Sequence, residues 1–538
     1  MIGNSITRRG ALILVAVAIG AAGLFAPAPA TAQVTAFKQA VAEAAARDDD
    51  IATYYRTNGY TPIWTGTTEA DRARRAELMR AIKGAASHGL PVARYDPDGL
   101  MAQLRAVRST RDRGLAEVAM SRVFLQYARD IQTGVINNPR SIDNGIVREI
   151  PHRDRMTYLR DITTAKPAAF FRALPPRSME YNSLIKEKVA MEGLMASGGW
   201  GATVPAKTLE PGDTGTAVIA LRNRLIAMDY LDRTNTMAYD SAISDAVMQF
   251  QIAHGLNPDG KVGSATMAQI NIGVEQRLQS VMVALERERW FNTERGKRHI
   301  LVNIPDFTAK IIDDGKITFM TRSVVGAPQP DRVTPEFSDV MEHMIVNPSW
   351  YVPRSIVTKE YLPSMQRNPG AAGHLVITDR RGRKISRSQI NFSKYTARNF
   401  PYSMHQPPSR SNALGLVKFI FPNKYNIYLH DTPSKSLFAR DVRAFSHGCI
   451  RLADPFDFAY ALLAVQEADP VAAFRSALNT GRETRIKLVN PVPVHLIYRT
   501  AVTNARGHTE YRADIYGRDA KIWSALSKAG VVLDGYRG

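Results

Sequence analysis

The chain has 538 residues, of which 45% are hydrophobic and 22% charged, and it carries a formal net charge of +20. This composition is typical of a globular protein. It excludes a disordered tail protein, a collagen-like fibre and a disulfide scaffold, because a single Cys cannot form an intramolecular bridge. The length predicts about three or four domains. The basic charge indicates a polyanionic partner such as nucleic acid, an anionic membrane face or an acidic wall polymer.

The first 32 residues have the pattern of a secretory signal peptide. Arg8 and Arg9 precede an apolar run at 11–25, and the small residues Ala30 to Ala32 follow, which predicts cleavage after Ala32. The alternative is an uncleaved membrane anchor, for which the apolar run is short. The arginine pair also faintly matches a twin-arginine signal. We therefore expect an exported, soluble chain, for which nucleic acid is not an expected partner.

Residues 33–200 are predicted to form a mostly helical lobe. The segment is rich in Ala, Arg and Leu, and Leu78, Ile82 and Ala85 recur at helical spacing before a stop at Gly89. The consecutive glycines at 198–199 mark its end, since they propagate a helix poorly.

Residues 205–275 are predicted to form a small three-helix module. Two amphipathic helices are indicated by apolar residues at three- and four-residue steps, and a third starts after Ser264. The apolar residues are Val218, Leu221, Leu225 and Met228, then Ile243, Val247 and Phe250. The segments 209–213, 250–251 and 259–263 resemble those of the small peptidoglycan-binding domain that accompanies many wall enzymes.

Residues 296–495 are predicted to form a β-rich domain. The apolar period changes to two at Ile300, Val302 and Ile304, and the turn at 313–315 indicates a hairpin. Further strands are expected at 426–430, 484–489, 494–498 and 511–515, with one helix from about Asp454. The stretch 351–411 has no clean period and is predicted to be an inserted capping lobe. Residues 496–538 are expected to form a β-rich extension that packs on the helical lobe or the β-rich domain.

The chemistry is expected at the single thiol, Cys449. A cysteine attacks a carbonyl as a thiolate, so it needs a base or a cation to lower its pKa, and His430 precedes it by 19 positions at the end of a predicted strand. Gly448 leaves room for a substrate and for backbone N–H groups that face an oxyanion. Arg451 can hold a carboxylate or support the loop.

Two other interpretations of this thiol are open. A lone Cys is often inert packing, although polar neighbours and an exported location disfavour that here. A zinc site from His430, His447 and Cys449 lacks a further ligand at the usual spacing, so no metal is expected.

The thiol lies in the run Ser446-His447-Gly448-Cys449-Ile450-Arg451, with His430 separated from Ser446 by fifteen residues. This pattern resembles the signature of the L,D-transpeptidases with a YkuD-type catalytic domain. The segments 347–353, 412–415 and 428–433 resemble the large periplasmic, YcbB-like members of that family, as do segments at 58–64, 88–90 and 490–517. The likeness covers nearly the whole expected mature chain.

The resemblance implies a multidomain α+β protein: a helical scaffold lobe, a peptidoglycan-binding domain and a catalytic domain with a capping insertion. It implies a periplasmic enzyme, without a cofactor, that joins the stem peptides of peptidoglycan by 3-3 crosslinks. Cys449 would form a thioester with a donor tetrapeptide and expel D-alanine. The other implied roles are His430 as proton donor and acceptor, Asp431 or its backbone as orienter, His447, Gly448 and the Cys449 N–H as oxyanion support, and Arg451, Ser446, Trp350, Asn412 and Gly415 for substrate.

Several functional alternatives remain open at this stage. Which histidine is the base is not settled by spacing. Water as acceptor would give an L,D-carboxypeptidase or an endopeptidase, and a protein amine would give an anchor of envelope proteins. A non-catalytic wall-binding scaffold is disfavoured because Cys449, His430 and His447 are all retained. Wall-synthesis proteins are expected partners, and carbapenem-type inhibitors are expected to acylate the thiol by family resemblance.

Overall fold

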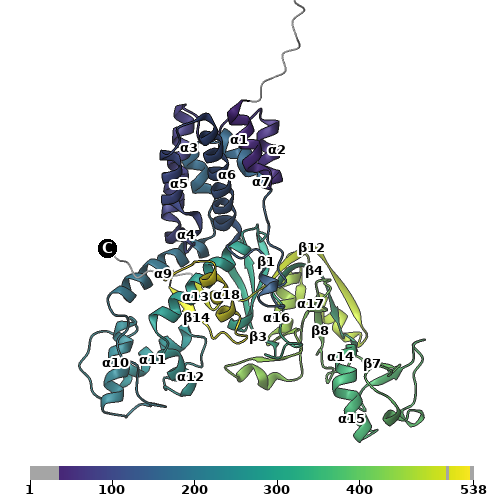
Figure 1. The fold of residues 1–538 in the computed structure, drawn as a ribbon. Coiled ribbons are helices and arrows are strands. Elements are labelled where there is room, and N and C mark those ends of the chain that lie inside the picture. The colour runs from purple at the N-terminus through teal and green to yellow at the C-terminus, as the bar shows by residue number, and fades with distance from the viewer. Residues whose placement is uncertain (1–34, 504–507, 534–538) are drawn as a thin grey trace, which may run out of the picture.

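The computed structural model describes residues 35–503 and 508–533 of the chain. The expected signal peptide therefore lies outside the described residues. Figure 1 shows a helical lobe, a small helical module, a central sheet domain and a lobe inserted into that domain. This arrangement confirms the predicted multidomain α+β fold. Within the described ranges, none of the helices combines the length and apolar character needed to cross a bilayer.

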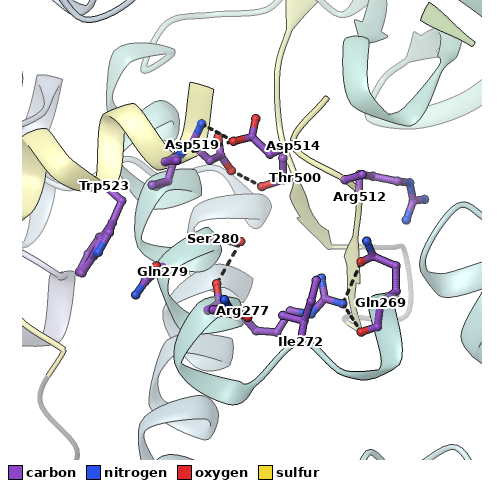
Figure 2. A pocket seen from close by; sticks show the side chains of 14 residues that line it. Gln269, Ile272, Arg277, Gln279, Ser280, Thr500, Arg512, Asp514, Asp519 and Trp523 are labelled. Carbon is purple, nitrogen blue, oxygen red and sulfur yellow. Dashed lines mark hydrogen bonds between the residues drawn. The ribbon is translucent and has the colours of Figure 1, made fainter. Parts of the chain in front are cut away.

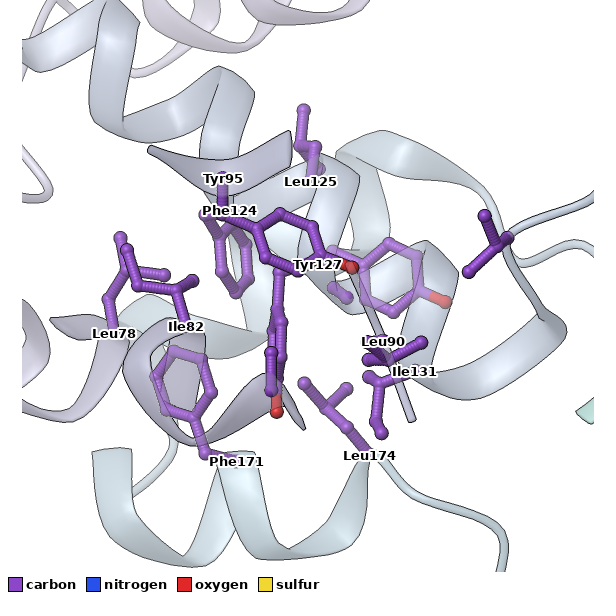
Figure 3. Packing of buried hydrophobic residues seen from close by; sticks show 14 of the residues in the cluster. Leu78, Ile82, Leu90, Tyr95, Phe124, Leu125, Tyr127, Ile131, Phe171 and Leu174 are labelled. Atoms are coloured by element: carbon purple, nitrogen blue, oxygen red, sulfur yellow. The ribbon is translucent and has the colours of Figure 1, made fainter. Parts of the chain in front are cut away.

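The helical lobe is built around the longest helix, α6. The helices are α1 (Ala36–Ala45), α2 (Asp49–Thr57), α3 (Glu69–Lys83), α4 (Val92–Tyr95), α5 (Pro97–Arg105), α6 (Thr110–Thr133), α7 (Arg155–Thr164), α8 (Pro167–Ala173) and α9 (Met179–Ala196). Phe124 and Ile131 of α6 belong to the same aromatic-rich core as Leu78 and Ile82 of α3 (Figure 3). The predicted helical spacing at Leu78 and Ile82 is thus confirmed.

A buried carboxylate fixes the irregular segment between α2 and α3. Glu117 of α6 accepts hydrogen bonds from the backbone N–H groups of Ile63 (2.6 Å), Trp64 (3.0 Å) and Thr65 (2.8 Å), and from the Tyr55 hydroxyl (2.6 Å). Because unpaired buried N–H groups are costly, this one side chain lets a loop without secondary structure lie inside the lobe.

The small module contains the three expected helices, α10 (Thr216–Ala227), α11 (Ser241–Ala253) and α12 (Ser264–Ile270). Its core includes the predicted apolar residues Val218, Leu221, Ile243 and Phe250. The loop between α11 and α12 is held by Gln251, whose amide donates to Asp259 (2.9 Å) and accepts from the Gly260 N–H (2.9 Å).

A helix that the sequence analysis did not predict, α13 (Val274–Trp290), connects the module to the sheet domain. Its last turns carry four consecutive charged residues, 286–289, which are at most 5% exposed. Such a run normally indicates a solvated face. Here each charge is paired: Arg289 with Glu286 (3.0 Å), Glu288 with Arg295 (2.8 Å), and Arg287 with Glu336.

The sheet domain is a nine-stranded sheet in the order β10-β3-β11-β9-β8-β4-β12-β1-β2, and β2 also pairs with β3. The strands therefore form a closed circuit around a core that includes Val302, Met344, Phe419 and Phe458. The strands are β1 (Arg298–Asn303), β2 (Thr308–Asp313), β3 (Lys316–Gly326), β4 (Phe337–Val346), β8 (Val417–Ile420), β9 (Leu429–His430), β10 (Ala444–Ser446), β11 (Ile450–Leu452) and β12 (Thr484–Ile497), with helices α16 (Pro455–Leu463) and α17 (Pro470–Asn479).

The inserted lobe has its own core, which includes Ile356, Met365, Ile377 and Met404. It consists of a three-stranded sheet in the order β5-β7-β6 and a short helical stretch. Its elements are β5 (Trp350–Tyr351), α14 (Arg354–Ile356), the π-helical turn η4 (Val357–Tyr361), α15 (Leu362–Arg367), β6 (Val376–Thr378) and β7 (Ser403–Gln406). A separate core of this kind indicates a lobe rather than a structureless loop.

Several predicted strands differ from the structure. The expected strand 426–430 is limited to β9, and the strands 484–489 and 494–498 are one strand, β12, with a register shift between Lys487 and Val492. Pro491 lies in that shift, where a missing N–H is tolerated. The expected strand 511–515 is instead β14 (Thr509–Tyr511), paired with β13 (Ala501–Thr503).

The C-terminal segment is therefore less β-rich than expected. Its last helix in the described residues is α18 (Arg518–Lys528). Gly517, directly before this helix, has a left-handed backbone conformation (φ 65°). The segment packs on both expected neighbours, since the Tyr511 hydroxyl donates to Glu187 of α9 (2.8 Å) and Arg518 pairs with Glu336 (3.0 Å).

We predict that Glu336→Gln destabilises the chain by about 3–5 kcal/mol, because it leaves the buried guanidinium groups of Arg287 and Arg518 without their shared carboxylate. Urea unfolding followed by tryptophan fluorescence measures this, since Trp290 lies on α13. The matched control is Glu210→Gln, which removes an exposed ion pair with Lys261 (3.2 Å) and should cost less than about 1 kcal/mol. Equal losses in the two variants would contradict a structural role for the buried network.

Candidate active site

Strand register gathers the site on one face of the sheet. β9 and β11 pair in parallel with Arg451 opposite His430, and β8 pairs with β9 with Lys418 opposite His430. Since side chains alternate along a strand, Leu429 and Ile450 point to the opposite face, where both are buried in the core. One face thus packs the domain, and the other carries His430 between two cations.

Cys449 immediately precedes β11 and lies beside Tyr428, two residues before His430. The Ile450 N–H donates to the Tyr428 carbonyl (3.0 Å), which fixes the two segments side by side. The thiol contacts the Asn426 carbonyl (3.5 Å) and is hydrogen-bonded to the Tyr428 hydroxyl. Alternation therefore places Cys449 and Tyr428 on the same face as His430 and Arg451, so the predicted thiol and base lie diagonally across adjacent strands.

The His430 ring is buried and held by the backbone that follows it. Nδ1 donates to the carbonyl of Asp431. Because a carbonyl only accepts, Nδ1 carries the proton of the neutral ring and Nε2 is its basic atom. Burial, and then the charge of Arg451, lower the pKa of His430 to about 3, so the ring is neutral at physiological pH.

The thiol is also neutral in the ligand-free site. Burial raises the pKa of Cys449 to about 11, against the opposing influence of the Tyr428 hydrogen bond and the charges of Arg451 and Lys418. The pair is therefore a thiol and a neutral imidazole, rather than a preformed thiolate and imidazolium. Attack on a carbonyl then requires removal of the thiol proton, for which a neutral ring is the competent acceptor.

Two cations on this face, Arg451 and Lys418, can still bond to a ligand. Arg451 is half-buried, and its Nε is buried without a hydrogen-bond partner. Burial lowers the pKa of Arg451 and of Lys418. Since unpaired buried charges are costly, a substrate carboxylate on this face is favoured. The substrate contact of Arg451 stays a prediction.

The motif loop is held by its own hydroxyl. Ser446 is buried, accepts the Gly448 N–H (3.1 Å) and donates to the Cys449 carbonyl (2.5 Å). Gly448 has φ +111°, and its carbonyl accepts from the Thr334 hydroxyl (2.8 Å). The expected oxyanion role of the Gly448 N–H is therefore not met in this conformation, because Ser446 occupies that donor. Of the two N–H groups expected to face the oxyanion, the N–H of Cys449 remains a candidate. Ser446 shapes the loop rather than offering its hydroxyl to a substrate.

The other motif histidine faces the inserted lobe. His447 Nε2 is hydrogen-bonded to Glu360 (2.6 Å), and the same carboxylate pairs with Arg332 (2.7 Å). Glu360 lies on η4, so one acidic side chain of the lobe contacts the motif and a loop of the sheet domain at once. In this arrangement His447 is turned toward the lobe.

Asp431 and Gly415 support the backbone that holds His430. The Asp431 carboxylate accepts from the Leu416 N–H (2.9 Å) and from Lys435 (2.8 Å), so only its backbone orients His430. Gly415 has φ +62°, and a Cβ there would lie 2.2 Å from Asp431 Oδ2, which explains the glycine.

Asn412 and Trp350 belong to the base of the inserted lobe. The buried Asn412 amide donates to the carbonyls of Pro348, Gln406 and Pro407 and accepts from the Leu414 N–H (2.8 Å). Its polar atoms are thus occupied, in contrast to the expected substrate contact. Trp350 pairs in register with Gln406 and packs on the core of the lobe.

The sequence analysis assigned no role to Lys418, Tyr428, Thr334 or Glu360. Tyr428 could have been found from the period of two that it shares with His430. The other three are brought to the motif only by pairing between distant segments. In the ranges 35–503 and 508–533, no three His, Cys, Asp or Glu side chains gather in a group that could hold a metal ion.

Comparison with known proteins identifies domains along the chain. Residues 297–472 match the L,D-transpeptidase catalytic domain (YkuD), residues 214–270 match a "Putative peptidoglycan binding domain", and residues 49–187 match the Scaffold domain. A Haemophilus influenzae protein named "Putative L,D-transpeptidase" is 32% identical over 226 residues. That match spans 41% of this chain and 45% of the relative, so it covers less than half of either.

Two solved structures match this chain at low sequence identity. An L,D-transpeptidase from Xylanimonas cellulosilytica matches with a TM-score of 0.18 and 15% identity, over 54% of this chain and 98% of that one. A fused zinc-dependent amidase/peptidase with a peptidoglycan-binding domain, from Clostridium acetobutylicum, matches with a TM-score of 0.14 and 13% identity, over 54% and 99%. Similarities at this level support no further conclusion.

We predict that Lys418→Gln slows alkylation of Cys449 by iodoacetamide at pH 9 about three- to tenfold, because loss of the positive charge raises the thiol pKa further. In the unaltered chain the rate should keep rising toward pH 11. The chain has one Cys, so mass spectrometry reports this thiol alone. Lys166→Gln, at an exposed position of the helical lobe, is the control. Unchanged kinetics in Lys418→Gln would contradict the placement of its ammonium group.

We also predict that Glu360→Gln loosens the inserted lobe, since it weakens charge-assisted bonds to His447 and Arg332. Hydrogen exchange of the peptides covering 354–367 should accelerate severalfold. Lys359→Gln is the matched control, because it breaks a more exposed pair with Asp331 (2.6 Å) on the same turn. Acceleration of the same size in both variants would argue against a special role for Glu360.

Proposed function

We propose that this chain, which carries an L,D-transpeptidase catalytic domain beside peptidoglycan-binding and scaffold domains, forms 3-3 crosslinks between stem peptides of peptidoglycan. The observation that carries the proposal is the register of β9 and β11, which places the single thiol of the protein on one sheet face with a buried, neutral histidine. Export to the periplasm, where peptidoglycan lies, is part of the proposal.

The first step would be acylation. His430 Nε2 accepts the thiol proton, and Cys449 Sγ attacks the carbonyl carbon of the L-centre of meso-diaminopimelate in a donor tetrapeptide. The negative charge that develops on the carbonyl oxygen is stabilised by the Cys449 N–H and by the nearby cations. The imidazolium returns its proton to the leaving nitrogen, D-alanine departs, and a thioester to Cys449 remains.

The second step would be transfer to an acceptor. The side-chain amine of a neighbouring stem loses a proton to His430 and attacks the thioester carbonyl. The new amide forms, the carbon–sulfur bond breaks, and the proton on His430 regenerates the thiol. Because His430 is neutral before each step, the same ring serves as base twice.

Arg451 and Lys418 would select the donor. A stem tetrapeptide carries carboxylates beside its scissile bond, and these two cations lie on the active face with no carboxylate partner among the described residues. A carboxylate bound there would also be in position to hold the scissile carbonyl near the thiol. The capping lobe, tied to the motif by Glu360, would close over the bound peptide.

Cys449→Ala is predicted to abolish product formation from disaccharide tetrapeptides while the circular dichroism spectrum stays unchanged, because no other thiol can form the acyl-enzyme. Mass analysis of the muropeptides measures this in the chain from residue 33 onward. Crosslinked dimers and free D-alanine should appear only with Cys449 present. Tripeptides without dimers would identify a carboxypeptidase, and dimers formed by Cys449→Ala would refute the assignment of the nucleophile.

A further inference from the structure

A cavity of about 340 Å³ lies outside the candidate active site, where the three-helix module meets the C-terminal segment. One wall is the face of α13 that carries Gln276, Gln279 and Ser280, and the opposite wall is α18 with Trp523 (Figure 2). Gln269, at the end of α12, lines the same cavity. The volume lies within the range of cavities that hold small ligands.

Three of the charged side chains that line the cavity already have partners within the protein. Asp514 accepts from the Tyr498 hydroxyl (2.5 Å) and from backbone N–H groups at the start of α18. Asp519 is bonded to Thr500 and lies 3.5 Å from Arg287. Arg512 pairs with Asp306 and with Glu510 (2.8 Å). These charged groups therefore already have hydrogen-bond or ion-pair partners within the protein.

Arg277 is the exception among the charged groups of the cavity. It is 4% exposed, its Nη2 donates to the backbone and side-chain oxygens of Gln269 (3.1 and 3.0 Å), and its guanidinium lies over the Tyr511 ring at 4.5 Å. Within the described ranges no carboxylate lies within ion-pair distance of it. Burial lowers its pKa to about 10, so it remains charged at neutral pH.

A buried cation without an anion is costly, and a ligand carboxylate would offset that cost. The carboxamides of Gln269, Gln276 and Gln279 can bond to amide or hydroxyl groups beside such a carboxylate, and the half-buried Trp523 offers an apolar ring. The walls therefore match a polar ligand that carries a carboxylate together with amide or sugar groups.

We propose that this cavity binds a carboxylate-bearing fragment of peptidoglycan, with Arg277 as the carboxylate anchor. The ligand class rests on the proposed function, whereas the site is separate from Cys449. The carboxylate can come from a stem peptide or from the lactyl group of a sugar that has lost its stem. Binding here would hold the wall polymer at the junction of the module, α13 and the C-terminal segment while the sheet domain acts on another stem.

Tryptophan resonances distinguish the two sites in one experiment. The chain has five Trp, of which Trp523 lies in the cavity and Trp350 in the inserted lobe. The full mature chain with Cys449→Ala, labelled with 5-fluorotryptophan, is titrated while ¹⁹F spectra are recorded, and Trp523→Phe assigns the cavity resonance. The probes are the tetrapeptide L-Ala-γ-D-Glu-meso-diaminopimelate-D-Ala, the disaccharide N-acetylglucosamine–N-acetylmuramic acid, and chitobiose, which lacks a carboxylate.

The tetrapeptide or the disaccharide should shift the Trp523 resonance, and whichever does so identifies the source of the carboxylate. Chitobiose should not shift it. No shift with either acidic probe, or an equal shift with chitobiose, would overturn the proposal. A shift of Trp523 would stand even if the enzyme formed no crosslinks, so failure here and failure of the proposed function are told apart.

Variants test the charge directly. Arg277→Gln should weaken binding at Trp523 at least tenfold, and Arg233→Gln, an exposed arginine of the same module, should leave it unchanged. Because Arg277 also packs on Tyr511, the exposed Gln276 provides a second test that spares the fold. Gln276→Glu should weaken binding about threefold and Gln276→Lys strengthen it about threefold. The same affinity in both Gln276 variants would contradict recognition of a carboxylate.

Discussion

The arrangement of the domains depends on the buried charges of α13. Along one turn, Glu286 accepts from the Ile136 N–H of the helical lobe, Arg287 pairs with Glu336 of the sheet domain, and Glu288 binds Arg499 of the C-terminal segment. Each charge is fully enclosed, so each needs its partner in place. The helix therefore specifies how three regions meet, because any other docking would leave a charge buried and unpaired.

In the candidate active site, too, polar groups that have hydrogen-bond partners differ in role from those that lack them. Ser446, Asn412 and Asp431 have their polar atoms satisfied by neighbouring backbone and side chains, so they set the shape of the loops. Arg451, by contrast, retains a buried donor with no partner. On the face that carries His430, such a donor can bond to a ligand. The division separates residues that build the site from residues that can bind substrate.

The protonation state of the ligand-free site follows from burial. Both the thiol and the imidazole are held neutral, since enclosure disfavours the charged form of each. The Cys449 thiol then loses its proton only when a substrate is bound, with the substrate carbonyl near the sulfur and a substrate anion beside the nearby cations. A neutral thiol also reacts slowly with oxidants, which suits the only cysteine of a chain expected to be exported.

The sequence alone determined the elements whose signals are local. The helical spacing around Leu78, the three helices of the module, the hairpin at 313–315 and the motif from Ser446 to Arg451 all depend on near neighbours, and the structure contains each of them. Tertiary structure decided the rest. Burial of the charged run in α13, the alignment of Lys418 with His430, the contact of Glu360 with His447 and the engagement of the Gly448 N–H all arise where distant segments pair or pack. No local pattern encodes these, because the free energy of a buried charge or an N–H group depends on the partner that the fold brings to it.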